Sequence, residues 1–182
     1  KKRINEARII FEELSEKGLP LIKTDDPLKI ILNTGLFGID GFTADHFFYE
    51  RGIIAELPEL MTLTFCLGFA EQKNFINHFC DLWNELILNV KSKNNLKSIK
   101  PPFELIQFTD ITPFDIWGRK SIKIPLSESI GKISADIISP YPPGIPLIIP
   151  GEIIDKKRIN WILEQSRHCK DLVNSYIRVL IP

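Results

Sequence analysis

Apolar residues recur at helix and strand spacings along the first 90 residues. The opening stretch carries an apolar residue about once per turn, which predicts a helix that ends near Gly18 (Ile4, Ala7, Phe11 and Leu14). A stronger amphipathic pattern over residues 75–86 predicts a second, longer helix. Apolar runs at 28–32 and 53–57 and an alternating pattern at 61–67 predict strands. Thr43 is expected to cap a short helix that reaches Arg51.

This order of elements (helix, strand, helix, strand, strand, helix) predicts an α+β fold. We expect a small mixed sheet with helices on one face, occupying residues 1–90. Residues 91–102, KSKNNLKSIKPP, lack apolar periodicity and are interpreted as a linker. A nucleic-acid patch is the alternative, but no aromatic residue interleaves with these lysines to stack on bases.

The pattern of residues 103–182 predicts a second small α+β segment, which differs from the first in its proline-rich run. Five of the thirteen prolines lie between Pro140 and Pro150, in the run PYPPGIPLIIPGE. Proline removes a backbone donor and clashes with the preceding helical turn, so this run predicts an extended loop. A helix is expected after Asp155, with Asp155 as its cap, and residues 176–181 are expected to form a last strand.

Composition and charge narrow the function classes. The chain has 182 residues, of which 44% are hydrophobic, and its formal net charge is zero. A balanced charge argues against a dedicated nucleic-acid binder, and no apolar run reaches the ~20 residues of a membrane-spanning helix. Three cysteines without a CxxC pair suggest a reducing, cytoplasmic location. Since Met61 is the single methionine, we expect the chain to be a processed or excised piece of a longer protein.

Motifs for common chemistries are missing from the sequence. The glycines of GLFGIDG are spaced three apart, which does not fit a dinucleotide-binding loop and favours a turn where backbones come close. His46, His78 and His168 are scattered and predict no metal site. No base is placed beside a cysteine nucleophile, so we assign no catalytic residue.

Two longer motifs carry a family resemblance. PLSESIGKISADIISPYPPGIPLIIPGE, residues 125–152, closely resembles the C-terminal region of bacterial Orn/Lys/Arg decarboxylases. GIDGFTADHFFYERGIIAELPEL, residues 38–60, is similar to the small domain of the same family, and both motifs occur in the family's order. The resemblance implies the aminotransferase-like fold, with residues 1–90 as the small domain and 103–182 as the C-terminal domain.

The resemblance also implies what this sequence lacks. Family members bind pyridoxal phosphate through a lysine in an S-x-H-K-type motif, within a large preceding domain, and no such motif occurs here. The chain is therefore expected to be the C-terminal portion of a pyridoxal-phosphate-dependent decarboxylase of arginine, ornithine or lysine, acting in polyamine-type metabolism. Its expected partners are the lysine-bearing domain, further copies in a homo-oligomer, and a basic amino acid. A non-catalytic binding or regulatory module without the cofactor domain is the alternative.

Two residues of the proline-rich run are candidate substrate contacts. Glu152 could pair with the distal cation of a basic amino acid if its carboxylate projects from a rigid loop, or it could favour the start of the next helix. Tyr141 could line the mouth of the substrate pocket, or it could be a packing residue. Glu56 and Glu59 are weaker candidates because exposed carboxylates are common.

Overall fold

The computed structural model describes residues 2–68, 74–90, 96, 102, 109–141, 144–167 and 174–181. The chain divides into two compact units, Lys1–Ser98 (unit 1) and Ile99–Pro182 (unit 2). The division falls inside the predicted linker 91–102, most of which lies outside the described residues. None of the described helices is long and apolar enough to cross a bilayer.

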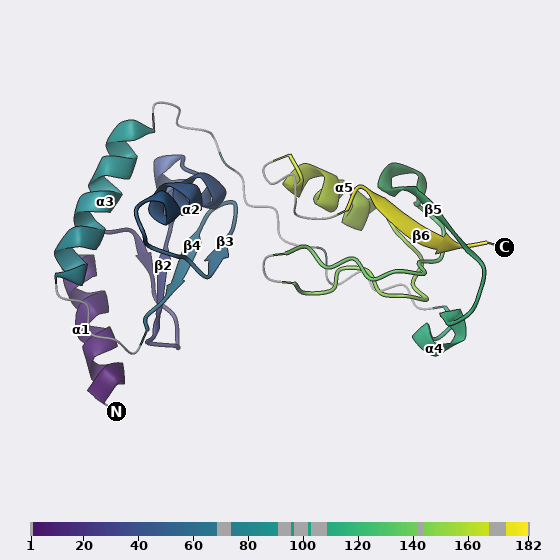
Figure 1. Ribbon diagram of the computed structural model, residues 1–182, viewed down its shortest axis with the longest axis horizontal. Coiled ribbons are helices and arrows are strands. Elements are labelled where there is room, and N and C mark those ends of the chain that lie inside the picture. The colour runs from purple at the N-terminus through teal and green to yellow at the C-terminus, as the bar shows by residue number, and fades with distance from the viewer. Residues whose placement is uncertain are drawn as a thin grey trace. The chain divides into compact units, whose positions relative to one another are not determined.

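Unit 1 is a four-stranded sheet with three α-helices, so its α+β class is confirmed (Figure 1). The strand order is β1-β2-β4-β3, and every neighbouring pair is antiparallel, so the expected mixed sheet is wrong in this detail. Short connections suit the pairs β1–β2 and β3–β4, since antiparallel strands can be joined directly, whereas β2 and β4 pair across the segment that contains α2 and β3. The strands are β1 (Leu21–Ile22), β2 (Lys29–Leu32), β3 (Leu57–Pro58) and β4 (Leu63–Cys66).

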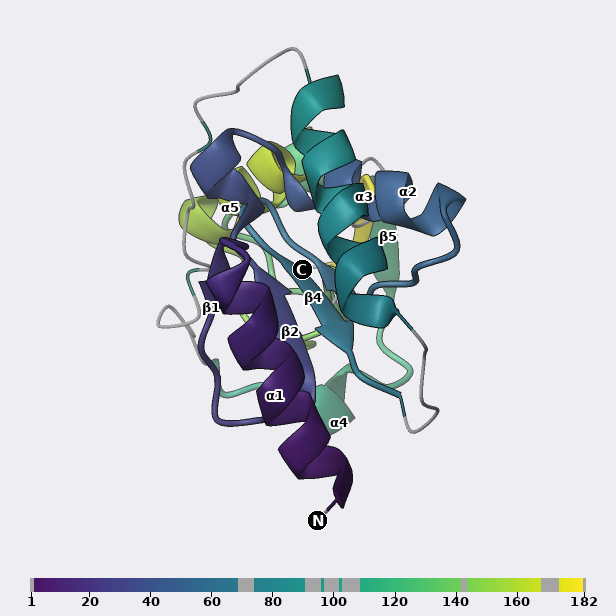
Figure 2. The ribbon, with the colours of Figure 1, turned by 90° about the vertical axis from the view of Figure 1, so that its left-hand side faces the viewer.

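One face of this sheet forms the core of unit 1. Helices α1 (Lys2–Glu16), α2 (Gly41–Glu50) and α3 (Phe75–Asn89) lie on that face, as predicted (Figure 2). Phe65 of β4 points into the core, where its ring packs edge-on against Phe79 of α3 at 5.1 Å and against Phe48 of α2 at 5.2 Å. Because side chains alternate along a strand, the neighbouring Cys66 is exposed on the other face.

Two boundaries in unit 1 differ from the predictions. Helix α2 begins three residues earlier than expected, because Asp40 rather than Thr43 is its N-cap and accepts the Thr43 N–H at 2.8 Å. The strand predicted at 53–57 is reduced to β3, and the turn predicted at Pro58 lies later, with the Glu59 N–H donating to the Thr62 carbonyl at 2.9 Å.

The glycine turn before α2 brings backbones close together, as its spacing predicted. A 3-10 helix, η1 (Thr34–Phe37), occupies the turn. The Gly41 N–H donates to the Glu59 carbonyl at 3.0 Å, and a Cβ at Gly41 would lie 2.1 Å from that oxygen. Gly35 is similarly close to Met61, where a Cβ would meet the methionine Cε at 2.3 Å. Glycine is therefore required at Gly41, where backbone oxygens would meet the Cβ, whereas at Gly35 the flexible end of the Met61 side chain could move aside.

Unit 2 is built around a two-stranded antiparallel sheet and one helix. Strand β5 (Ser121–Pro125), which the sequence did not reveal, pairs with the predicted last strand β6 (Tyr176–Leu180). Helix α5 (Lys156–Gln165) follows its predicted cap, Asp155. A one-turn helix, α4 (Pro113–Ile116), and a 3-10 turn, η2 (Leu126–Glu128), complete the described elements. The core gathers apolar residues from these strands, the proline-rich region and α5 (Leu126, Ile138, Leu147, Ile148, Ile154, Ile159, Ile162, Ile177 and Val179).

Candidate functional site

The proline-rich region folds back on itself within unit 2. Ile138 and Ile148 form an antiparallel bridge, and the Leu147 N–H donates to the Ile138 carbonyl at 2.8 Å. The Gly144 N–H donates to the Pro140 carbonyl at 2.9 Å and closes a turn. The described part of the run is non-helical, as the prolines predicted, while Pro142 and Pro143 lie outside the described residues.

The end of this loop is fixed by a close backbone approach. Gly151 has a φ of +94°, a conformation that favours glycine, and a Cβ there would lie 2.5 Å from the Ile111 carbonyl oxygen. The Thr109 hydroxyl donates to the Gly151 carbonyl at 2.6 Å. The glycine of the PGE motif is therefore a packing requirement, and it places Glu152 at a defined position.

Glu152 points into unit 2 rather than away from it. Its side chain accepts hydrogen bonds from Arg158 Nη1 at 2.6 Å and from the Ile149 N–H at 3.1 Å. The residue is 4% exposed, so the prediction that its carboxylate projects from the loop is wrong. The cation that it contacts is Arg158, which is itself only 1% exposed.

Arg158 joins the loop to the first turn of α5. Its Nη1 and Nη2 atoms also donate to the carbonyls of Leu147 at 2.9 Å and Ile153 at 2.8 Å, and its Nε donates to Asp155. Two carboxylates and two carbonyl oxygens thus surround one buried guanidinium, which provides the pairing that a buried charge needs. We call Arg158, Glu152 and Asp155 the buried ion network.

Asp155 combines this role with capping of α5. Its side chain accepts the backbone N–H groups of Lys157 at 2.8 Å and Arg158 at 2.9 Å. Burial acts to raise the pKa of Asp155, but the hydrogen bonds and positive charge of Arg158 outweigh it, and the pKa is lowered. The carboxylate is therefore kept ionised where it supports both the helix and the ion network.

The two sequence-predicted site residues thus occupy opposite environments. Tyr141 lies near the turn of the loop and is 72% exposed, so it is not a packing residue of unit 2. The geometry of Glu152 favours a structural role, through an ion pair rather than through the helix terminus. Its substrate role remains a prediction, and among the described residues its hydrogen-bond partners are Ile149 and Arg158 rather than Tyr141.

A polar cluster on the sheet of unit 1 was not anticipated from the sequence. Glu56 accepts a hydrogen bond from the Cys66 thiol at 2.6 Å and lies 3.5 Å from the Lys29 amine. Lys29 and Cys66 are register partners in β2 and β4, a pairing that single-sequence patterns do not reveal. Burial and the bond to Glu56 raise the pKa of Cys66, so the thiol stays neutral.

The remaining candidates form no catalytic or metal constellation. Glu59 accepts the Thr62 hydroxyl at 2.9 Å, and His46 lies 3.4 Å from Glu50 along α2. Within the described ranges, no group of three or more His, Cys, Asp or Glu side chains could hold a metal ion. His168 lies outside the described residues.

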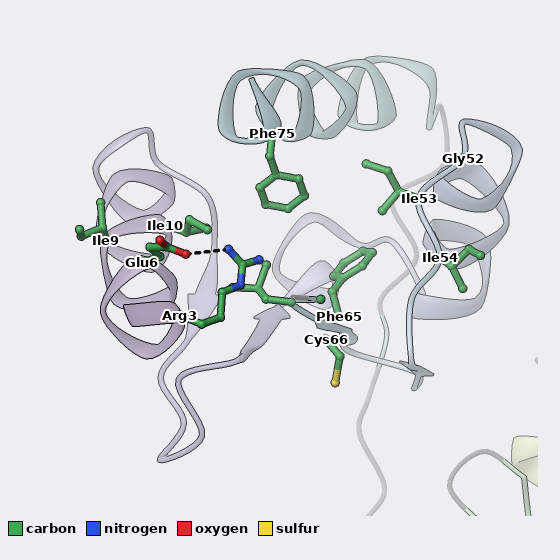
Figure 3. A pocket seen from close by; sticks show the side chains of 12 residues that line it. Arg3, Glu6, Ile9, Ile10, Gly52, Ile53, Ile54, Phe65, Cys66 and Phe75 are labelled. Atoms are coloured by element: carbon green, nitrogen blue, oxygen red, sulfur yellow. Dashed lines mark hydrogen bonds and ion pairs between the residues drawn. The ribbon is translucent and has the colours of Figure 1, made fainter. Parts of the chain in front are cut away.

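A hollow of about 570 Å³ lies in unit 1 between α1, β4 and the start of α3 (Figure 3). Its walls are mostly apolar (Ile9, Ile10, Ile53, Ile54, Phe65, Leu67 and Phe75). Arg3 reaches from α1 toward Phe65, and its Nη1 donates to Glu6 at 3.2 Å. The Cys66 sulfur points away from the phenyl rings, which is consistent with its bond to Glu56 on the opposite face of the sheet.

Comparison with known proteins links these two units to one family. Residues 114–171 match the family described as Orn/Lys/Arg decarboxylase, C-terminal domain. An arginine decarboxylase of Bacillus anthracis is 30% identical over 160 residues, which cover 84% of this chain and 32% of that protein. This chain matches the C-terminal region of the Orn/Lys/Arg decarboxylases.

Other decarboxylases of this kind agree with that assignment. The constitutive lysine decarboxylase of Escherichia coli is 28% identical over 183 residues, covering 72% of this chain and 26% of the enzyme. A solved structure of that E. coli enzyme has the same fold, with a TM-score of 0.67 and 19% identity, over 99% of this chain and 40% of the solved one. The chain spans about a third of the length of the arginine decarboxylases that it matches.

The residues of this decarboxylase-like chain do not fit pyridoxal phosphate. The sequence has no S-x-H-K-type motif. In the described part, no lysine lines the apolar hollow, and the two lysines at a second hollow are Lys23 and Lys29. A Schiff-base lysine needs a preorganised pocket, whereas Lys23 is exposed and Lys29 is paired with Glu56.

Proposed function

We propose that this chain is the C-terminal portion of a pyridoxal-phosphate-dependent decarboxylase of arginine, ornithine or lysine, in polyamine-type metabolism in the cytoplasm. The observation that carries the proposal is the similarity to arginine decarboxylases over 84% of the chain, which includes the match to the family's C-terminal domain. In this proposal the cofactor belongs to a separate, lysine-bearing portion of the enzyme, because the residues present here do not fit it.

The chain's own contribution is a rigid loop and surfaces for assembly. The buried ion network holds the proline-rich loop against α5, and Tyr141 near the loop's turn remains free to contact a substrate. Glu152 then acts as a positioning residue through Arg158. A preformed loop orders a substrate with little further loss of entropy.

Exposed aromatic residues support an assembly role for unit 2. Trp117 is 91% exposed, and Phe114 beside it is also almost fully exposed. A capping box between Thr112 and Asp115, with Pro113 in the first turn, fixes the backbone of α4 that carries Phe114. Aromatic side chains presented on a rigid turn are typical of interface anchors. We propose that they contact the lysine-bearing portion of the enzyme.

The test compares the purified chain alone with the chain co-expressed with a lysine-bearing portion of an arginine decarboxylase. We expect the chain alone to show no saturable aldimine absorbance and no CO₂ release from arginine, ornithine or lysine. Together, the two parts should co-purify and release CO₂. Replacing Trp117 with serine should weaken co-purification, while replacing the exposed Leu88 of unit 1 should not. Decarboxylation by the chain alone, or failure of the pair to associate, would contradict the proposal.

A further inference from the structure

The apolar hollow of unit 1 has the size and lining of a small-molecule site. Its volume of about 570 Å³ lies within the range of roughly 300–1,000 Å³ that ligand pockets occupy. Phe65 and Phe75 bring aromatic rings into it, and Ile53 and Ile10 add aliphatic surface (Figure 3). A hollow that is mostly apolar and has a few polar groups at one side favours a ligand with an apolar body and one polar end.

Arg3 brings a guanidinium to one side of this hollow. Its side chain is 20% exposed, and Nη1 is engaged by Glu6. The Nε atom is buried and has no hydrogen-bond partner among the described residues. Because Nε has almost no accessible surface even with the hollow empty, a ligand there would meet the outer guanidinium nitrogens of Arg3, which lines the hollow.

The charges around the hollow determine which kind of hydrogen-bond acceptor a ligand should carry. Arg3 and Glu6 are its two lining residues of formal charge, and Glu6 is also 3.6 Å from Lys2. Glu6 is thus shared between two cations, which leaves Arg3 incompletely neutralised. A carboxylate oxygen accepts well from a guanidinium, whereas a polyphosphate would meet only one arginine and be repelled by Glu6. A monoanion is therefore favoured over a polyanion.

We propose that this hollow binds a small organic carboxylate with an apolar, preferably aromatic, body. The apolar body lies against Phe65, Phe75 and Ile53, and the carboxylate accepts from the outer guanidinium nitrogens of Arg3. All residues of this site belong to unit 1. The inference does not depend on the proposed decarboxylase function, because it concerns binding alone.

Methyl NMR of the full chain provides a direct test. Four isoleucines line the hollow (Ile9, Ile10, Ile53 and Ile54), and the isoleucines of unit 2 serve as an internal reference. With ¹³C-labelled isoleucine δ1 methyls, titration with 4-phenylbutanoate should shift the hollow's signals to saturation and leave those of unit 2 unchanged. The neutral 4-phenylbutanamide should bind about 10- to 100-fold more weakly, since a hydrogen bond between charged groups is lost.

Variants of α1 then assign the effect to Arg3. Arg3→Gln should weaken binding of 4-phenylbutanoate about 10- to 100-fold, and Arg3→Lys should weaken it less, because the charge is kept. Arg8→Gln is the matched control on the same helix, since Arg8 lines a different hollow, and its binding should match the wild type. Glu6→Gln should strengthen binding several-fold, because the guanidinium is no longer shared with a carboxylate.

Three results would each overturn the proposal. The first is that the methyl signals show no saturating shift up to roughly 10 mM 4-phenylbutanoate, where binding is too weak to matter. The second is equal affinity for the carboxylate and the amide. The third is that Arg3→Gln binds the carboxylate as tightly as the wild type. The first two are measured on the unaltered chain, so the proposal remains testable even if a variant fails to fold.

Discussion

Replacing Glu152 with glutamine tests the buried ion network most directly. The change keeps the shape of the side chain and one acceptor oxygen, but it removes the charge that lies 2.6 Å from Arg158. Removing one partner of a buried ion pair costs about 3–5 kcal/mol when the other charge is left uncompensated. Arg158 still has Asp155 and two carbonyl oxygens, so we expect a smaller loss, about 2–3 kcal/mol in the free energy of unfolding of unit 2.

The measurement must report the two units separately, because a two-unit chain need not unfold in one step. Hydrogen exchange read by mass spectrometry across a urea series does so, and unit 1 serves as the internal reference. Glu128→Gln is the matched control, an exposed carboxylate in the same unit, and it should change stability by less than about 0.5 kcal/mol. A loss below about 1 kcal/mol for Glu152→Gln, the value of an exposed pair, would refute the argument that this ion pair is buried and structural.

Three further outcomes are expected. The hydrogen bonds and charge of Arg158 outweigh burial and lower the pKa of Asp155, so its contribution to stability is present above the unfolded-state pKa of about 4 and is lost as the pH falls through the lowered folded-state pKa. The stability of unit 2 should therefore fall less in acid for Asp155→Asn than for the wild type, as measured by hydrogen exchange of unit 2 peptides across a urea series at each pH. Gly41→Ala should destabilise unit 1 by more than about 3 kcal/mol or prevent its folding, because the new Cβ meets two carbonyl oxygens. Gly68→Ala is the control: its Cβ has open space, so the urea midpoint of unfolding should change little. Burial and the hydrogen bond that the thiol donates to Glu56 raise the pKa of Cys66, so Glu56→Gln should increase its alkylation by iodoacetamide near pH 8, measured on the Cys66 peptide. An unchanged rate would argue against the thiol–carboxylate bond.

Helices and caps that depend on residues close together in the sequence could be predicted from it. The amphipathic patterns of α1 and α3 and the cap at Asp155 correspond to observed elements, because each depends on residues within a few turns. The spacing of the glycines indicated a close backbone approach, and Gly41 makes one. Strand β5 was missed, because its burial depends on pairing with β6, more than fifty residues away.

The candidate site was harder to predict, since the orientation of a side chain depends on its tertiary partner. The motif ending in Glu152 was singled out as a candidate, but the sequence did not show which cation the carboxylate meets. The signal was present six residues later, where Arg158 falls on the face of α5 that carries Ile159 and Ile162 into the core. An arginine on the apolar face of a short helix indicates a buried ion pair and argues for a nearby carboxylate.

The position of Arg158 in the chain also affects when the loop can take its shape. Its four partners precede it by 11, 6, 5 and 3 residues. Closing such short segments costs little chain entropy, and local contacts form quickly. During synthesis the loop therefore has all its charged and carbonyl contacts as soon as the first turn of α5 has left the ribosome. It gains them before β6 has left the ribosome, so the corner between loop and helix can form ahead of the pairing of β5 with β6.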